Sequence, residues 1–158
     1  MAAAAPREAP EINVSDIVFP VSTNHLGTMF GGHVMAMMDK AAVLAAIRFA
    51  RGIYVTVSSD SIQFHTPIQQ GDLIEARARV AWVGNTSVIV KVEIFRESPF
   101  EEGRALCTTG WFALAARDKN GKPQPVPQIL LGGDAARADH AQAAAFRARS
   151  LEQKASRG

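Results

Sequence analysis

The segment that decides the fold is NHLGTMFGGHVMAMMDKAAVLAAIRFA, which spans residues 24–50. From residue 34 to residue 50 the apolar side chains leave no polar face on a helix, although Asp39 and Lys40 lie near its middle. A helix without a polar face lies in a protein core or in a membrane. Residues 32–50 would form a helix about 28 Å long, but a bilayer would penalise each of the two charges by about 3 kcal/mol. We therefore expect a helix in a protein core and no membrane contact.

The composition suits a single folded domain, because 47% of the 158 residues are hydrophobic. The formal net charge is +2, and the excess positive charge falls within residues 132–158. The rest of the chain is electrically balanced, which argues against a nucleic-acid-binding surface, since such a surface needs clustered basic residues. A single cysteine and an N-terminal segment without the features of a signal peptide favour a cytoplasmic protein.

Three segments are expected along the chain. Residues 1–11 are rich in Ala and Pro, and we expect them to be disordered. Residues 12–130 are expected to form the folded domain. Residues 131–158 are an Ala/Arg-rich tail with helix-forming residues but almost no large apolar anchors, so we expect this tail to be disordered as well.

Four strands are predicted after the helix, because runs of β-branched and aromatic residues alternate there with turn residues. They span residues 53–64, 73–83, 86–96 and 105–116. With one earlier strand, this order indicates an α+β fold in which a curved antiparallel sheet wraps a long central helix. Such a sheet has an open edge. We expect two subunits to pair these edges into one continuous sheet and to share an active site.

The start of the helix contains polar groups that could take part in a reaction. Gly31 and Gly32 permit close approach of a ligand to the backbone, and the unpaired amides of the first turn can polarise a carbonyl group. Alternatively, the two glycines only allow a tight turn before the helix. Asp39 has no partner on its own helix and could attack a carbonyl carbon or deprotonate a water molecule. The alternative is a buried acid bonded to loop amides. Asn24 could hold a water molecule or a carbonyl oxygen, but taken alone it is a turn residue.

Asn24, Gly27, Gly31, Gly32 and Asp39 at these spacings resemble the brain-type acyl-CoA hydrolases, which are hotdog-fold acyl-CoA thioesterases. The resemblance covers residues 12–130. It also rests on five shorter segments, which are residues 64–67, 71–72, 84–87, 92–94 and 121–127.

The resemblance implies an enzyme that hydrolyses acyl-CoA to a free carboxylic acid and coenzyme A, without a metal or another cofactor. Asp39 would be the nucleophile or general base, and Asn24 would reach the site from the facing subunit. A homodimer would then be required, and such dimers commonly pack as trimers of dimers, which are hexamers. A predicted hairpin would contact CoA through Gly84, Asn85, Thr86 and Ser87. The sequence does not choose which basic residue meets the CoA phosphates among Arg77, Lys91, Arg96 and Arg104.

The sequence lacks the residues that several other kinds of active site require. Cys107 has no basic neighbour in its strand to lower its pKa, so we expect a core residue and not a nucleophile. The four histidines have no cysteine partners and no ligand spacing, so no metal site is expected. The motifs of serine hydrolases, phosphate-binding loops and dinucleotide-binding folds are missing from the sequence.

Two alternative functions fit the same fold. An enoyl-thioester hydratase would use a histidine beside an acid, and His33 and His65 are the candidates. A non-enzymatic acyl-CoA-binding protein would bind the thioester without turnover.

Overall fold

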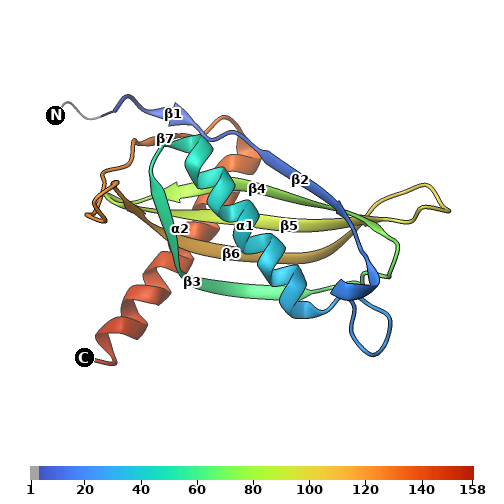
Figure 1. The fold of residues 1–158 in the computed structure, drawn as a ribbon. Helices are drawn as coiled ribbons and strands as arrows, with labels where there is room; N and C mark the ends of the chain where they lie inside the picture. The colour runs from blue at the N-terminus through green and yellow to red at the C-terminus, as the bar shows by residue number, and fades with distance from the viewer. Residues whose placement is uncertain (1–3) are drawn as a thin grey trace.

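The predicted central helix is α1, Gly31–Phe49, in a computed structural model that describes residues 4–158. It lies across one face of a five-stranded antiparallel sheet (Figure 1). The strands are β2 (Ile12–Ile17), β3 (Ile53–Phe64), β4 (Leu73–Val83), β5 (Ser87–Glu97) and β6 (Ala105–Arg117), and their order in the sheet is β2-β4-β5-β6-β3. A short 3-10 helix, η1, Pro20–Ser22, precedes α1. The predicted α+β arrangement is confirmed, with strand ends within one residue of those expected.

The core lies between α1 and the inner face of the sheet. Met38 and four alanines of α1 have no exposed surface, and these small side chains let the helix approach the strands closely. The strands contribute alternate residues to this core, as expected for a sheet with one face on a core. Those on β4 and β5 are Ile74, Ala76, Ala78, Val80, Val88, Val90, Val92 and Ile94.

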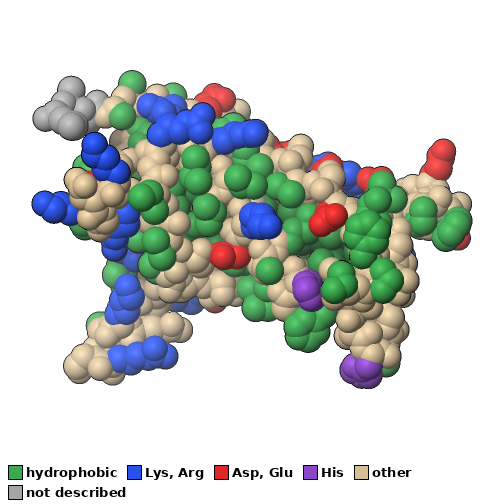
Figure 2. All heavy atoms as spheres, in the orientation of Figure 1, with side chains coloured by type: hydrophobic (Ala, Val, Ile, Leu, Met, Phe, Trp, Pro, Cys, Tyr) green, Lys and Arg blue, Asp and Glu red, His purple; other side chains and the backbone are tan. Residues whose placement is uncertain are grey.

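The opposite face of α1 is open in the single chain. Met35 and Leu44 are 43% and 39% exposed, and Figure 2 shows hydrophobic side chains gathered over this face with few charged groups among them. The prediction that the whole helix is buried is therefore wrong for one protomer. The physical reason is that one curved sheet covers only one side of a helix, so the second apolar side stays open in a single protomer.

The strand β3 forms an open edge of the sheet. Within the described chain it pairs only with β6, and its other edge has no partner along its 12 residues. One register shift between Thr56 and Ser58 and another between Asp60 and Gln63 mark bulges, and Ser61 has a positive φ of 51° at the second one. Val55 and Val57 are 51% and 58% exposed. A long unpaired strand with exposed valines is a surface for pairing with another chain.

The N-terminal segment is not wholly disordered. In β1, Arg7–Glu8, the chain pairs in parallel with β7, Ile129–Leu130, and the Arg7 guanidinium donates to the Phe49 carbonyl at 3.3 Å. The expectation of disorder over residues 1–11 is wrong for this part, and residues 1–3 lie outside the described residues. A strand of two residues is enough to hold this segment, because its backbone groups pair with β7 and its Arg7 side chain bonds to the last residue of α1.

The C-terminal tail is mostly helical, which corrects the expectation of disorder over residues 131–158. It forms α2, Asp134–Ala155, which crosses the outer face of the sheet behind α1 (Figure 1). Ala143 and Phe146 are buried there against Ala81 and Ile89. Because alanine-rich sequences have a high intrinsic helix propensity, one large anchor and a few ion pairs are enough to hold the helix on the sheet.

No helix in residues 4–158 combines the length and the apolar character that crossing a membrane requires.

We predict that Phe146→Ala releases α2 from the sheet. Phe146 is the one large side chain that α2 buries, so the substitution should cost about 3 kcal/mol of docking free energy. Hydrogen exchange of the α2 amides should then accelerate while the amides of β4 and β5 keep their protection. Phe100→Ala is the matched control, because Phe100 is 93% exposed. Unchanged α2 protection in Phe146→Ala would contradict the prediction.

Candidate active site

The start of α1 leaves backbone donors free. Phe30 precedes the helix with extended backbone and provides no side-chain cap, and its carbonyl accepts from the amides of His33 and Val34 at 2.9 and 3.1 Å. The amides of Gly31 and Gly32 have no acceptor among residues 4–158. The structure therefore has the unpaired donors that the sequence predicts at this helix end, where the helix dipole adds positive potential.

A cavity of about 410 Å³ opens beside Gly31. Its walls are mostly apolar, with Met29, Val34 and Phe64 among them. Thr108 lines the same cavity and is fully buried, and its hydroxyl has no hydrogen-bond partner in the described chain. A mainly apolar cavity next to free backbone amides suits a ligand with a carbonyl group and a hydrocarbon part.

Asp39 finds its partner on the edge strand. The Thr56 hydroxyl, from β3, donates to Asp39 Oδ1 at 2.5 Å, and no partner for Oδ2 occurs among the described residues. Asp39 is half-buried, on the border between the covered and the open face of α1. The hydrogen bond fixes the orientation of the carboxylate and leaves one oxygen free. Sequence reasoning missed Thr56, although its residue type in a strand that passes the helix was a usable signal.

Asn24 organises the loop before α1. Its side-chain oxygen accepts from the amides of Leu26 and Thr28 at 2.9 and 3.2 Å, and its amide nitrogen donates to the Thr28 hydroxyl at 2.8 Å. Gly27 completes the turn with a positive φ of 78°. One hydrogen of the Asn24 amide stays free for a ligand. No contact joins Asn24 and Asp39 in this structure of one protomer.

The predicted CoA-binding hairpin lies far from α1's first turn. Gly84, Asn85, Thr86 and Ser87 connect β4 to β5, and the Gly84 amide donates to the Ser87 carbonyl at 2.8 Å. The loop at the other end of β4 contacts the segment before α1, through a 2.7 Å bond from the Met29 amide to the Ile68 carbonyl. The length of β4 therefore separates the hairpin from Gly31 by about 35 Å within one protomer.

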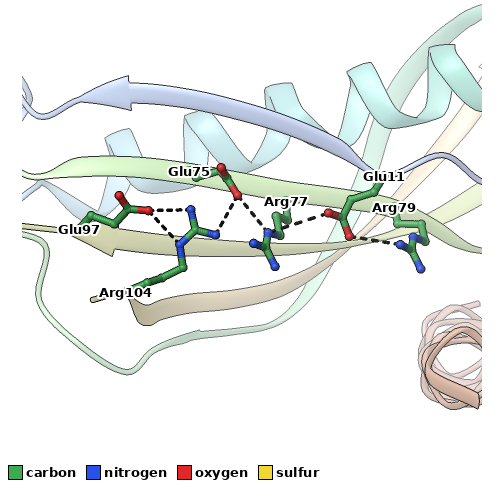
Figure 3. Close-up of polar contacts among 6 residues, drawn as sticks. All are labelled: Glu11, Glu75, Arg77, Arg79, Glu97 and Arg104. Atoms are coloured by element: carbon green, nitrogen blue, oxygen red, sulfur yellow. Dashed lines mark hydrogen bonds and ion pairs between the residues drawn. The ribbon is translucent and has the colours of Figure 1, made fainter. Parts of the chain in front are cut away.

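The candidate cations for the CoA phosphates are already paired. Figure 3 shows Arg77 and Arg104 sharing Glu75 in a network that also includes Glu11, Arg79 and Glu97. The Arg77 and Arg104 guanidinium groups also lie over the Phe95 ring, at 4.7 and 5.3 Å. The other two candidates are paired as well, Lys91 with Asp139 at 2.9 Å and Arg96 with Asp72 at 3.3 Å. A phosphate would have to compete with these carboxylates.

The remaining titratable groups do not assemble a second centre. Cys107 is fully buried, and burial raises the pKa of its thiol, which makes it a poor nucleophile. The exposed His65 ring bonds to the Thr109 hydroxyl at 3.0 Å, and the exposed His33 ring packs edge-on against Phe30. The described residues contain no group of three or more histidine, cysteine, aspartate or glutamate side chains arranged to hold a metal ion.

Comparison with known proteins decides the family. Residues 26–101 match the thioesterase superfamily. A Bacillus subtilis protein described as the uncharacterized acyl-CoA thioester hydrolase YkhA is 40% identical over 113 residues, which are 72% of this chain and 66%, just under two thirds, of that protein. The acyl-CoA hydrolase of Staphylococcus aureus, solved with butyryl coenzyme A and coenzyme A, is 32% identical with a TM-score of 0.85 and 96% of each chain covered. This chain belongs to the acyl-CoA thioester hydrolases.

The fold of this chain is the predicted hotdog fold. A hexameric acyl-CoA thioesterase superposes on it with a TM-score of 0.89 at 32% identity, over 98% of this chain and 99% of that chain. That match extends beyond residues 12–130, which agrees with the ordered strands and helix outside this range. The narrower assignment to the brain-type acyl-CoA hydrolases stays a prediction.

We predict that Glu75 makes the stability of the fold sensitive to acid. Partial burial raises the pKa of Glu75, but hydrogen bonds from Arg77 and Arg104 outweigh burial, so its pKa lies below the ordinary value of 4.5. The Glu75 carboxylate therefore binds a proton more readily in the unfolded chain than in the folded one. Ionised Glu75 contributes its full stability above the unfolded pKa, and this contribution is lost as the pH falls through the folded pKa. Glu75→Gln should flatten the loss of stability below about pH 4.5.

Urea unfolding between neutral and acid pH measures this effect, and Glu101→Gln is the matched control on an exposed loop. Parallel stability curves for the wild type and Glu75→Gln below this pH would contradict the prediction.

Proposed function

We propose that this protein hydrolyses acyl-CoA thioesters to a free carboxylic acid and coenzyme A, with Asp39 as the group that acts on the thioester carbonyl or on the attacking water. The hydrogen bond of 2.5 Å between Thr56 and Asp39 carries the proposal. A half-buried carboxylate on an apolar helix, held by one hydroxyl and with one oxygen free, is suited to general-base or nucleophilic chemistry.

The intervals between Asn24, Asp39 and Thr56 in the sequence support the assignment of Asp39. The Staphylococcus aureus hydrolase has been solved with an aspartate, an asparagine or a threonine replaced by alanine. The replaced asparagine precedes the aspartate by 15 residues, and the threonine follows the aspartate by 17 residues. Asn24, Asp39 and Thr56 have the same residue types at the same two intervals. We infer that they form one functional set in which Thr56 positions Asp39.

The site is proposed to form between two subunits. Gly31 and Asp39 are eight residues apart on one helix, or about 12 Å along its axis. A reacting carbonyl has to lie within about 3 Å of both its oxyanion donors and its attacking group. One protomer does not bring these groups to the same thioester. A partner with an antiparallel α1 would place Gly31, Gly32 and Asn24 of one subunit against Asp39 of the other.

The open edge of the sheet supplies a means of pairing. Two copies of β3 can join as antiparallel neighbours and extend the sheet across the dimer. Figure 1 shows that the loop holding Asn24, between η1 and α1, projects past the line of β3, which is the direction of such a partner. The open apolar face of α1 then remains for contacts between dimers. We propose a homodimer as the catalytic unit and a trimer of dimers as the full assembly.

The proposed reaction needs only protein groups. The free amides of Gly31 and Gly32 donate hydrogen bonds to the thioester carbonyl oxygen and stabilise the negative charge that develops on it. In the general-base route, Asp39 takes a proton from water as the water oxygen bonds to the carbonyl carbon, with Asn24 holding this water. The carbon–sulfur bond then breaks, and the departing thiolate takes a proton to give coenzyme A. The acyl chain occupies the cavity beside Gly31.

In the nucleophilic route, Asp39 bonds to the acyl carbon directly, the thiolate leaves, and water cleaves the mixed anhydride. A single turnover in isotopically labelled water separates the two routes, because only hydrolysis of the anhydride can place label in the Asp39 carboxylate.

The CoA portion is proposed to reach Gly84, Asn85, Thr86 and Ser87 of the partner subunit. In an antiparallel dimer, the hairpin of one protomer lies at the same end of the joined sheet as the α1 N-terminus of the other. Its hydroxyls and turn amides can then bind phosphate or pantetheine groups.

We predict that Asp39→Asn lowers kcat/KM for acyl-CoA hydrolysis by on the order of 10³-fold, because the amide can neither take a proton nor attack. Thiol release from short, medium and long acyl-CoA esters measures it. Thr56→Ala should lower kcat, and Thr56→Ser should restore most of it because serine keeps the hydroxyl. If Asp39→Asn stays active while His33→Ala or His65→Ala loses activity on an enoyl-CoA, the proposed function would change from thioester hydrolysis to enoyl-thioester hydration.

We predict that two inactive variants restore each other when mixed. Asn24→Ala and Asp39→Asn chains should each be inactive alone, and after unfolding and refolding together they should regain about a quarter of wild-type activity, because half of the dimers are mixed and each mixed dimer has one intact site. Refolding each variant alone is the control. No recovery from a mixture shown to contain mixed dimers would place Asn24 and Asp39 in the same subunit's site.

A further inference from the structure

The last turns of α2 extend beyond the sheet of their own subunit. The helix crosses the outer face through Ala143 and Phe146, and it reaches the edge strand β3 where Arg149 pairs with Asp60 at 2.8 Å. Residues 151–155 are all exposed. Figure 1 shows these turns projecting past β3, on the same side as the loop that holds Asn24. We call residues 150–155 the overhang.

The composition of the overhang favours a helix even though its own subunit covers little of it, since residues 151–155 are exposed and only Ser150 and Lys154 line a small cavity with β3. Leu151, Glu152, Gln153, Lys154 and Ala155 are all strong helix formers. A helix end without tertiary contacts nevertheless frays, since short helices are marginal in water. A helix that continues past its last anchor gains stability only when something packs against it.

The position of the overhang defines what can pack there. If β3 pairs with β3 of a second copy, as the proposed function requires, the partner's sheet continues from this edge at about 4.8 Å per strand. The overhang is about 9 Å long, so it spans about two strands of that sheet. It lies on the side of the outer face, because α2 crosses that face throughout.

The chemistry of the two surfaces is complementary. Leu151 is 49% exposed on the overhang, and β3 exposes Val55 and Val57. Val55 alternates with the buried Tyr54 and so faces away from the core, while Val57 lines a small outer-face cavity with Phe146 and Lys154. In a two-fold dimer each surface occurs twice, so each overhang meets the apolar edge of the other subunit, and the stem of Lys154 can cover further apolar surface.

We propose that the overhang of α2 docks on the outer face of a second copy of this chain, beside the partner's β3, and clamps the paired edge strands. The contact rests on the proposed β3 pairing and adds to it a second layer on the outer face of the joined sheet. Each α2 thereby belongs to two subunits, with its first turns on its own sheet and its last turns on the partner's.

Hydrogen exchange of the full-length wild type tests the clamp. The reference is the variant Val55→Lys, which places a like charge on each of the two edge strands and should be monomeric by sedimentation. Amides of residues 151–155 should exchange at least about ten-fold more slowly in the wild-type dimer than in this monomer. Amides of residues 139–146 should be protected in both proteins, because they lie on their own sheet.

A second pair of variants keeps the test independent of that monomer. Leu151→Asp should raise the dimer dissociation constant by about ten-fold, whereas Ala148→Asp adds the same charge to an exposed position before the overhang and should leave the constant unchanged. A dimer whose residues 151–155 exchange as fast as in the monomer, or that Leu151→Asp does not weaken, would overturn the clamp alone. A monomeric wild type would overturn both the clamp and the β3 pairing.

Discussion

The width of the sheet is the constraint on which the rest of the structure depends. Five strands cover one side of α1 and leave its other side, with Met35 and Leu44, exposed. The same sheet ends in β3, a 12-residue strand that pairs only with β6 among residues 4–158. Apolar surface and unpaired backbone groups both favour association. The chain therefore folds into a unit with two open surfaces, and the proposed assembly covers both with other copies of the same chain.

Asp39 links this constraint to the chemistry. A carboxylate on an apolar helix needs a hydrogen-bond donor, because an unpaired buried charge is costly. The donor is Thr56, which lies on the open edge strand, so the carboxylate is held at the border of the protomer and not inside its core. In the proposed dimer, an acid at that border faces a ligand that enters between subunits. The geometry of the helix also separates Asp39 from the free amides of Gly31 and Gly32 within one protomer, and the second subunit of the proposed dimer would remove that separation.

Much of the fold could be predicted from local sequence patterns. The strand 73–83 has its predicted ends because turn residues bound it, and α1 begins one residue before the predicted start because glycine pairs are poor markers of a helix boundary. The helix α2 could not be predicted from apolar periodicity, since its attachment rests mainly on Phe146. β1 and β7 were equally hidden, because a two-residue pairing between distant segments leaves no pattern in either one.

The candidate site was predictable only in part, for a related reason. One stretch of 16 residues contains Asn24, Gly31, Gly32 and Asp39, so these four candidates can be found together as a local sequence motif. Thr56 is separated from that stretch, and the bulges of β3 alter the simple alternation that would tell which of its side chains face α1.

The basic residues show a different limit. Arg77 and Arg104 have the charge that a phosphate site needs, but neighbouring carboxylates already pair with both of them. A sequence shows that a charge is present and does not show which neighbour already holds it.

Pairing of the edge strands would connect stability, solubility and activity in one event. A free β3 edge is a hazard, because any extended segment can add to it. If the active site is complete only when two β3 strands meet, the association that hides this edge also brings Asn24 and the helix amides to Asp39. A clamp from α2 on the outer face would favour that pairing over others, since an unrelated strand has no surface for the overhang. Specificity of assembly then follows from a helix whose last turns lie outside the core of its own subunit.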